Sequence, residues 1–338
     1  MNTTTSSLEN PHIPVMIKEV IKTCNPFKGG TYIDCTFGGG SYSKKLLEFS
    51  NTKVIAIDRD KIVKKEAKEI KNKYKNNFLF YHEKFSNIDK IIDKDTKPDA
   101  IIFDLGLSTI QLLDFKRGFS FRSNEKIDMQ MGLSSLSAEE VLNNYDEKKI
   151  RLIIKLFGEE KEAARIARNI IKTRESKRIT LVTELVDIIE KSKKKNYLKK
   201  INVCTKTFQA LRIFVNKETT ELVEGLIKAS KIVKFGGKII VVSFHSIEDK
   251  VVKYFFTNYS SNKSKPSRYL PVENSKPNFL FESYKNVLLK PSIEEVLNNP
   301  ASRSAKLRYA VRGQQNFIYP DEFKIKFKKY LELEDNVQ

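Results

Sequence analysis

A glycine-rich turn and an acidic residue after the next strand are the first residues whose types and spacing suggest chemistry. Residues 34–43 (DCTFGGGSYS) follow one apolar run and lead into a helical pattern, and the next apolar run ends at Asp58. Glycines let the backbone approach a ligand closely, and a carboxylate at the end of a second strand accepts hydrogen bonds from ribose hydroxyls. The dinucleotide pattern G-x-G-x-x-G fails at its third glycine, where Ser43 stands. Together, the glycine-rich turn and Asp58 predict a site for a nucleoside-type cofactor.

Two further residues with catalytic side chains, Asp104 and His245, also follow apolar runs, in FDLGLS (103–108) and SFHSIED (243–249). Ligands bind beyond the carboxyl ends of the strands in a doubly wound sheet, so Asp104 is expected to face the same crevice as Asp58. The alternative for Asp104 is a turn former or helix cap. Two interpretations of His245 stay open, namely a contact with substrate or with Asp104 in the crevice, and a capping or core role.

Four short runs of β-branched and aromatic residues are typical of strands buried on both faces, and they can position these side chains. They span residues 31–37, 53–58, 100–106 and 238–244, and the helical patterns between the first three span residues 43–49 and 60–74. Alternation of strand and helix predicts an α/β fold with a doubly wound, mostly parallel, Rossmann-like sheet.

The alternation stops between the third and fourth strands. Residues 114–221 are mostly helical by pattern and rich in Lys and Arg, with a capping box at Ser137 and Glu140 that predicts a helix over 137–157 and a second helix from Glu159. Three strands alone would make a poor sheet. We therefore predict a discontinuous core, residues 1–113 and 222–338, interrupted by a helical, basic insertion domain over 114–221 that recognises the substrate.

The composition favours a polyanionic partner. Lys plus Arg number 62 and Asp plus Glu 42, a formal net charge of +20, which favours nucleic acid first and an anionic membrane surface second. No apolar run approaches the roughly 18 residues of a membrane span, and the N-terminus lacks the pattern of a signal peptide. The three cysteines and three histidines are dispersed without metal-ligand spacing. We expect a cytoplasmic protein with no metal and no membrane partner.

Distinctive stretches run in order along almost the whole chain. They are HIPV (12–15), DCTFGGGSYS (34–43), AIDRD (56–60), FDLGLSTIQLLD (103–114), RGFSF to DMQM (117–131), TKTFQALRIFVNKE (205–218), SFHSIEDKVVK (243–253) and NPASRSAKLR (299–308). With these stretches the chain resembles the bacterial 16S ribosomal RNA cytosine-N4 methyltransferases, which act on the decoding region of the small ribosomal subunit. The resemblance implies a class I methyltransferase core with a helical insertion, S-adenosylmethionine as methyl donor, and 16S rRNA as partner.

The resemblance also implies roles for individual residues. The contacts with S-adenosylmethionine carried over from the family are Gly40, Ser41, Tyr42, Asp58, Phe85, Asp104 and Gln111. Asp58 would bind the ribose, Phe85 would lie against the adenine, and Asp104 and Gln111 would lie near the methionine side. Where the family usually has Gly-Gly-His-Ser, this chain has Gly40-Ser41-Tyr42-Ser43. Contacts through backbone N–H groups survive this change, but a role that needs an imidazole at position 42 does not.

Methylation of the cytosine N4 amine needs an acceptor for an N4 hydrogen, because the nitrogen lone pair is delocalised into the ring. Asp104 and His245 are the catalytic candidates, and whether Asp104 serves the substrate or only the donor stays open. Methylation at C5 would need a cysteine nucleophile, and Cys24, Cys35 and Cys204 have no partner motif.

Side chains that contact RNA are expected outside this centre. Phe119 and Phe121 are candidates for holding a splayed base, with core packing as the alternative, and Arg303, Lys306 and Arg308 are expected to contact phosphates. Two other functions compete with the methyltransferase: a nicotinamide oxidoreductase, and a non-catalytic RNA-binding factor for ribosome assembly. The oligomeric state, monomer or homodimer, is not determined by these motifs.

Overall fold

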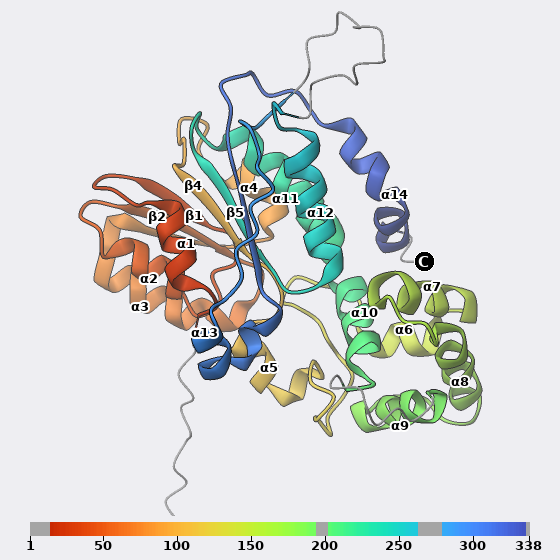
Figure 1. Ribbon diagram of the computed structural model, residues 1–338. Helices are drawn as coiled ribbons and strands as arrows, with labels where there is room; N and C mark the ends of the chain where they lie inside the picture. The colour runs from red at the N-terminus through yellow and green to blue at the C-terminus, as the bar shows by residue number, and fades with distance from the viewer. Residues whose placement is uncertain (1–13, 194–201, 263–278, 336–338) are drawn as a thin grey trace, which may run out of the picture.

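The computed structural model of the protein describes residues 14–193, 202–262 and 279–335. Its centre is a six-stranded sheet in the order β3-β2-β1-β4-β5-β6, in which β6 alone runs antiparallel to its neighbour (Figure 1). The strands are β1 (Thr31–Asp34), β2 (Lys53–Asp58), β3 (Phe78–His82), β4 (Ala100–Asp104), β5 (Lys238–Ser243) and β6 (Lys306–Val311). The predicted doubly wound, mostly parallel α/β fold is confirmed.

Alternate residues of each central strand belong to two different hydrophobic layers, as the two-residue period of a strand requires. Ile101 and Phe103 of β4 pack into one layer, and Ala100 and Ile102 pack into the other. The first layer contains helices α4 (Ile88–Ile91), α11 (Glu218–Ile232), α12 (Ser246–Asn258) and α14 (Asp321–Asp335), and the second contains α1 (Ile17–Cys24), α2 (Ser41–Leu47) and α3 (Lys64–Tyr74). Figure 1 shows α2 and α3 on one side of the strands and α11 and α12 on the other.

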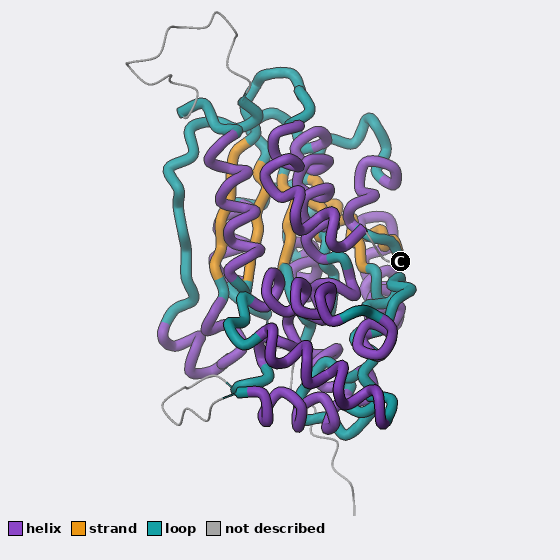
Figure 2. Tube along the Cα trace, turned by 90° about the vertical axis from the view of Figure 1, so that its right-hand side faces the viewer, coloured by secondary structure: helices purple, strands orange, loops and turns teal. Residues whose placement is uncertain are grey.

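A group of five helices lies beyond one end of the sheet (Figures 1 and 2). They are α6 (Ala138–Asn144), α7 (Glu147–Gly158), α8 (Ala163–Ser176), α9 (Val182–Ser192) and α10 (Thr205–Asn216). Two short helices, α5 (Thr109–Leu113) and α13 (Ile293–Asn298), complete the set of α-helices in the described ranges. Arg59, directly after β2, donates to the Asn216 carbonyl at 2.9 Å and to the Ser134 hydroxyl at 2.8 Å. The helical group is therefore tied to the carboxyl end of the sheet.

Details of the predicted helices differ from the structure. The capping box at Ser137 and Glu140 is confirmed, but the helix predicted over 137–157 is broken because Asp146 caps a new helix by accepting from the Lys149 amide at 2.7 Å. The second helix begins at Ala163 rather than at Glu159.

Three further observations bear on the predicted boundaries and partners. Helix α11, which packs on the sheet, begins before the predicted boundary at residue 222, and the division into domains stays a prediction. Residues 12 and 13 of the HIPV stretch lie outside the described ranges. Among the described helices, none combines the length and the apolar composition that crossing a membrane requires.

Candidate active site

A crevice opens at the carboxyl ends of the strands, beside the point between β1 and β4 where the strand order reverses direction. Ligands of doubly wound sheets bind at this point. The crevice holds about 1420 Å³ of empty space including its open mouth. Six of the residues predicted as ligand contacts line it, namely Ser41, Tyr42, Asp58, Phe85, Asp104 and Gln111, whereas Gly40 and His245 do not.

The glycine-rich turn brings the backbone close to Asp58. Gly38 and Gly40 have φ angles of +50° and +72°, which side-chain-bearing residues rarely adopt. A Cβ atom at Gly40 would lie 2.7 Å from both Ile70 and Phe37, so Gly40 supports the turn from behind instead of facing the crevice. The Gly38 N–H donates to Asp58 Oδ2 at 2.8 Å. The turn therefore orients the acidic side chain at the end of β2.

Asp58 is a half-buried carboxylate with acceptor capacity left over. Its Oδ1 accepts from the Asp60 N–H at 2.8 Å, and burial raises its pKa to about 6. Each carboxylate oxygen can accept more than one hydrogen bond. Asp58 lines the crevice, so its remaining lone pairs suit donors such as ribose hydroxyls.

Gln111 connects two of the turns that form the crevice. Its Oε1 accepts from the Ser108 N–H at 3.0 Å, as part of the capping box that starts α5, and its Nε2 donates to Asp60 Oδ2 at 2.8 Å. Arg117 pairs with the same Asp60 oxygen at 2.6 Å. Both ends of the Gln111 amide are thus engaged by the protein, and its predicted contact with the methionine part of a donor stays a prediction.

Asp104 combines burial with an unused acceptor. Its N–H donates to Thr36 Oγ1 at 2.7 Å, but its Oδ1 is buried and receives no hydrogen bond from any residue that the structure describes. Burial raises the Asp104 pKa to about 8, although a hydrogen bond with Tyr42 opposes this rise. An acceptor left without a donor is costly, so the arrangement suits a ligand that supplies one.

Tyr42 links Asp104 to the start of the described chain. Its hydroxyl donates to the Val15 carbonyl and also contacts the Asp104 carboxyl. A hydroxyl has a single proton to donate. Tyr42 therefore donates either to Val15 or to Asp104, and donation to Asp104 stabilises the ionised carboxylate, which is the effect that opposes the rise of its pKa.

His245 caps α12 and lies outside the crevice. Its Nδ1 accepts from the Glu248 N–H at 3.4 Å and its Nε2 lies 3.0 Å from Glu248 Oε1. The side chain is about 10% exposed. This position matches the capping interpretation of His245 and gives no support to the predicted catalytic contact in the crevice.

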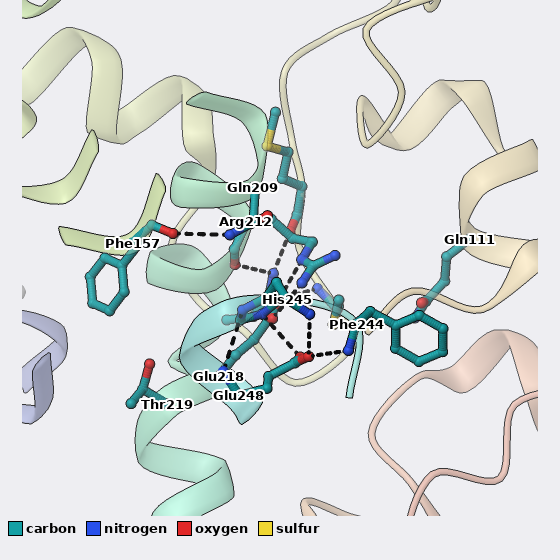
Figure 3. Close-up of polar contacts among 12 residues, drawn as sticks. Gln111, Phe157, Gln209, Arg212, Glu218, Thr219, Phe244, His245 and Glu248 are labelled. Carbon is teal, nitrogen blue, oxygen red and sulfur yellow. Dashed lines mark hydrogen bonds and ion pairs between the residues drawn. The ribbon is translucent and has the colours of Figure 1, made fainter. Parts of the chain in front are cut away.

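The acids near His245 already have a positive partner. Arg212 of α10 donates through Nε and Nη2 to the two Glu218 oxygens, each at 2.9 Å (Figure 3). Glu218, His245 and Glu248 offer ligand atoms within 4.8 Å of one another, the spacing of a cation site. The Arg212 guanidinium occupies both Glu218 oxygens and supplies the balancing charge, so we assign no metal to this cluster.

Side chains that were expected to contact RNA make contacts within the protein. Phe119 is 6% exposed and lies under the Arg117 guanidinium, and Phe121 packs edge-on against a ring of α10. Phe119 therefore serves packing, the alternative left open for it, whereas Phe121 is only partly buried and its contact with a base stays a prediction. Arg308 is 4% exposed and donates to Asp249 at 2.7 Å, so its predicted phosphate contact is wrong.

The three cysteines are buried, and burial raises the pKa of each thiol. A buried thiol with a raised pKa is a poor nucleophile.

Phe244 and Glu248 are among the residues of the crevice that sequence reasoning did not predict as site residues. The Phe244 N–H donates to Glu248 Oε2 at 2.8 Å. The available signal was the spacing of His245 and Glu248, which is that of a capping box with a histidine in place of the usual serine or threonine.

Comparison with known proteins places the chain in a family. Residues 9–313 match the MraW methylase family. A protein of Ehrlichia canis (strain Jake), "Ribosomal RNA small subunit methyltransferase H", is 41% identical over 302 residues, covering 88% of this chain and 98% of its own length. Proteins of the same name from Orientia tsutsugamushi (strain Boryong) and Rickettsia bellii (strain OSU 85-389) are 39% and 41% identical, each covering 90% of this chain and 99% of its own length. The resemblance inferred from the sequence is confirmed, and the chain belongs to the MraW methylase family.

Proposed function

We propose that this protein transfers a methyl group from S-adenosylmethionine to the N4 amine of a cytidine in the decoding region of 16S rRNA. The observation that carries the proposal is the buried Asp104 oxygen, which no described donor satisfies, in a crevice that also contains Asp58. The names of the relatives, which specify ribosomal RNA of the small subunit, support the choice of substrate.

The residues of the crevice fit the donor. Asp58, oriented by the Gly38 amide, has lone pairs for ribose hydroxyls, and the half-buried Phe85 offers an apolar wall beyond β3. S-adenosylmethionine supplies an electrophilic methyl group on a positively charged sulfur. A positive charge beside Asp104 favours its ionised form, so donor binding and ionisation of Asp104 support each other.

Ionised Asp104 can accept a hydrogen of the N4 amine. Accepting this hydrogen bond turns the nitrogen lone pair out of conjugation and towards the methyl group, and the carboxylate then takes the proton. Without the donor, burial raises the Asp104 pKa to about 8, so the carboxyl is mostly protonated at pH 7 and the positive charge of the donor favours the ionised form that accepts the hydrogen. Tyr42 holds the carboxyl in place through its hydroxyl.

We further propose that residues 114–221 form the insertion domain that recognises the RNA. The helices of this region lie beyond the same sheet end as the crevice, and the chain carries a net charge of +20. Contacts with phosphates make binding strongly dependent on salt. A protein that modifies small ribosomal subunits works where these subunits are made, so we place it in the cytoplasm.

A transfer assay with variants tests the proposal. The wild-type protein is expected to move label from methyl-labelled S-adenosylmethionine to small subunits that lack the modification, and Asp104→Asn is expected to lower the rate at least about 100-fold. S-adenosylhomocysteine should raise the Tm of both proteins, and NAD should raise neither. Wild-type binding of S-adenosylhomocysteine without transfer would favour the non-catalytic assembly factor.

A further inference from the structure

Among the residues that the structure describes, four aromatic side chains line the crevice, and they differ in how much ring surface they leave open. Phe37 and Tyr42 are 2% and 4% exposed, Phe37 packing against neighbouring rings of β3 and Tyr42 bonding to Val15. Phe85 and Phe244 are only half-buried. These two are therefore the aromatic residues of the crevice that retain surface for a ligand.

Phe85 and Phe244 lie on opposite sides of the sheet. Phe85 packs edge-on against Phe103 of β4, with ring centroids 5.3 Å apart, in the hydrophobic layer of α11. Phe244 follows β5 and packs in the layer of α1 and α2, which also contains Tyr42. Asp104 follows Phe103 on β4, so its side chain points to the face opposite to Phe103. Phe244 and Asp104 therefore share a face, and Phe85 does not share it.

The Phe244 ring is also close to Asp104 along the sheet. The Leu105 N–H donates to the Val242 carbonyl at 2.9 Å, which continues the pairing of β4 and β5 beyond Asp104. A Cβ atom at Gly106 would lie 3.2 Å from Cδ2 of Phe244. The ring thus lies against the turn that directly follows Asp104.

The cap of α12 fixes the position of Phe244. Glu248 Oε2 accepts from the backbone N–H groups of Phe244 at 2.8 Å and His245 at 3.2 Å. Figure 3 shows the Phe244 ring on the side away from His245, so the buried cap holds the backbone while the ring remains at the crevice. Because the ring is already held in place, a ligand that binds against it does not lose free energy to ordering this side chain.

We propose that the acceptor cytosine stacks on Phe244 with its amine edge directed at Asp104. This inference rests on the proposed function, and it assigns the two halves of the crevice: the donor takes the β1–β3 side with Asp58 and Phe85, and the base takes the β4–β5 side. A base drawn out of a folded RNA loses its stacking partners, and an aromatic face replaces them. Phe244 is the aromatic residue placed to do so beside Asp104.

Three variants test this inference. Phe244→Leu removes the aromatic face, Phe244→Tyr keeps it, and Phe235→Leu removes an aromatic ring that is 56% exposed and lies outside the crevice. Measured quantities are the Kd for small subunits in the presence of S-adenosylhomocysteine, kcat/KM for transfer, the Kd for S-adenosylhomocysteine, and Tm as a check of folding.

Phe244→Leu is expected to weaken subunit binding and kcat/KM roughly 5- to 150-fold, the range of one base–aromatic stack, with donor affinity unchanged. Phe244→Tyr should stay close to wild type, as should Phe235→Leu. Equal results for Phe244→Leu and Phe235→Leu, or a loss confined to S-adenosylhomocysteine affinity, would overturn the inference. If the wild-type protein binds small subunits but transfers no methyl group, the proposed function fails. The Kd values of the variants for small subunits still show in that case whether Phe244 contributes to RNA binding.

Discussion

Replacing Asp104 with asparagine should make the protein more stable while it stops the reaction. The Asp104 side chain is half-buried, its Oδ1 is buried and has no described donor, and burial raises the pKa of the carboxyl to about 8. An unfolded chain has an aspartate pKa near 3.9. At pH 7 the folded protein therefore holds a proton that the unfolded chain has released.

The sign and size of the effect follow from this difference in proton binding. Because the folded pKa lies above the unfolded one, the stability that Asp104 contributes is complete below about pH 4 and is lost as the pH rises towards 8. The slope is at most about 1.4 kcal/mol per pH unit, so the free energy of unfolding falls by up to about 2.7 kcal/mol between pH 5 and pH 7 through this group. The amide of the Asp104→Asn variant does not titrate and has no such slope. Other buried acids, including Asp34 and Glu334, remain in both proteins and largely cancel in the comparison.

Urea unfolding at pH 5, 6 and 7 measures the difference. Asp104→Asn should gain stability over wild type with each rise in pH, whereas Asp95→Asn, at an exposed loop position, should run parallel to wild type. Transfer should be lost while S-adenosylhomocysteine still binds. A constant gap between Asp104→Asn and wild type, or a variant less stable at pH 7, would show that Asp104 is already ionised and satisfied in the folded protein, and would refute the reasoning.

Three more predictions concern other parts of the site. Arg212→Ala leaves Glu218, whose side chain is only 14% exposed, without its cation and should lower the free energy of unfolding by about 3 kcal/mol; a loss under about 1 kcal/mol in urea unfolding would show that the pair behaves as a surface pair. Gly132→Ala places a Cβ atom 1.8 Å from the Arg59 carbonyl oxygen at a φ of +52°, so it should cost on the order of 2–4 kcal/mol, and an unchanged Tm would show that the turn rearranges freely. Asp58→Asn should weaken S-adenosylhomocysteine binding about 10-fold or more in calorimetry. Wild-type affinity should also fall as the pH drops below about 6, because protonation of Asp58 removes the negative charge that strengthens its hydrogen bonds from the ribose hydroxyls; affinity independent of pH over this range would argue against a ribose contact.

The sequence was most informative where burial is most complete. Strands β1, β2, β4 and β5 form the middle of the sheet, and their continuous apolar runs revealed them. The two strands that were missed, β3 and β6, are its edges. Only Phe78 of β3 is buried, and β6 contains Lys306 and Arg308 among its apolar residues. Edge strands need no continuous apolar run, so their sequence signal is weak.

The same contrast holds for the site. Asp58 and Asp104 were predicted correctly as crevice residues because the carboxyl ends of parallel strands meet at one sheet edge. The role of Arg308 depends on its ion pair with Asp249, 59 residues away in the sequence. The position of His245 depends on the helix cap that it forms with Glu248. Pairings of this kind arise from the packing of whole elements, and local patterns do not reveal them.

The most direct test is to identify the nucleoside that the protein modifies. Small ribosomal subunits lacking the modification are incubated with the purified protein and methyl-labelled S-adenosylmethionine, and the digested RNA is analysed by mass spectrometry. Label in N4-methylcytidine is the predicted result, and it should disappear with Asp104→Asn. Label in 5-methylcytidine, or no label in the RNA while S-adenosylhomocysteine binds, would contradict the assignment of Asp104 as the acceptor for the cytosine amine.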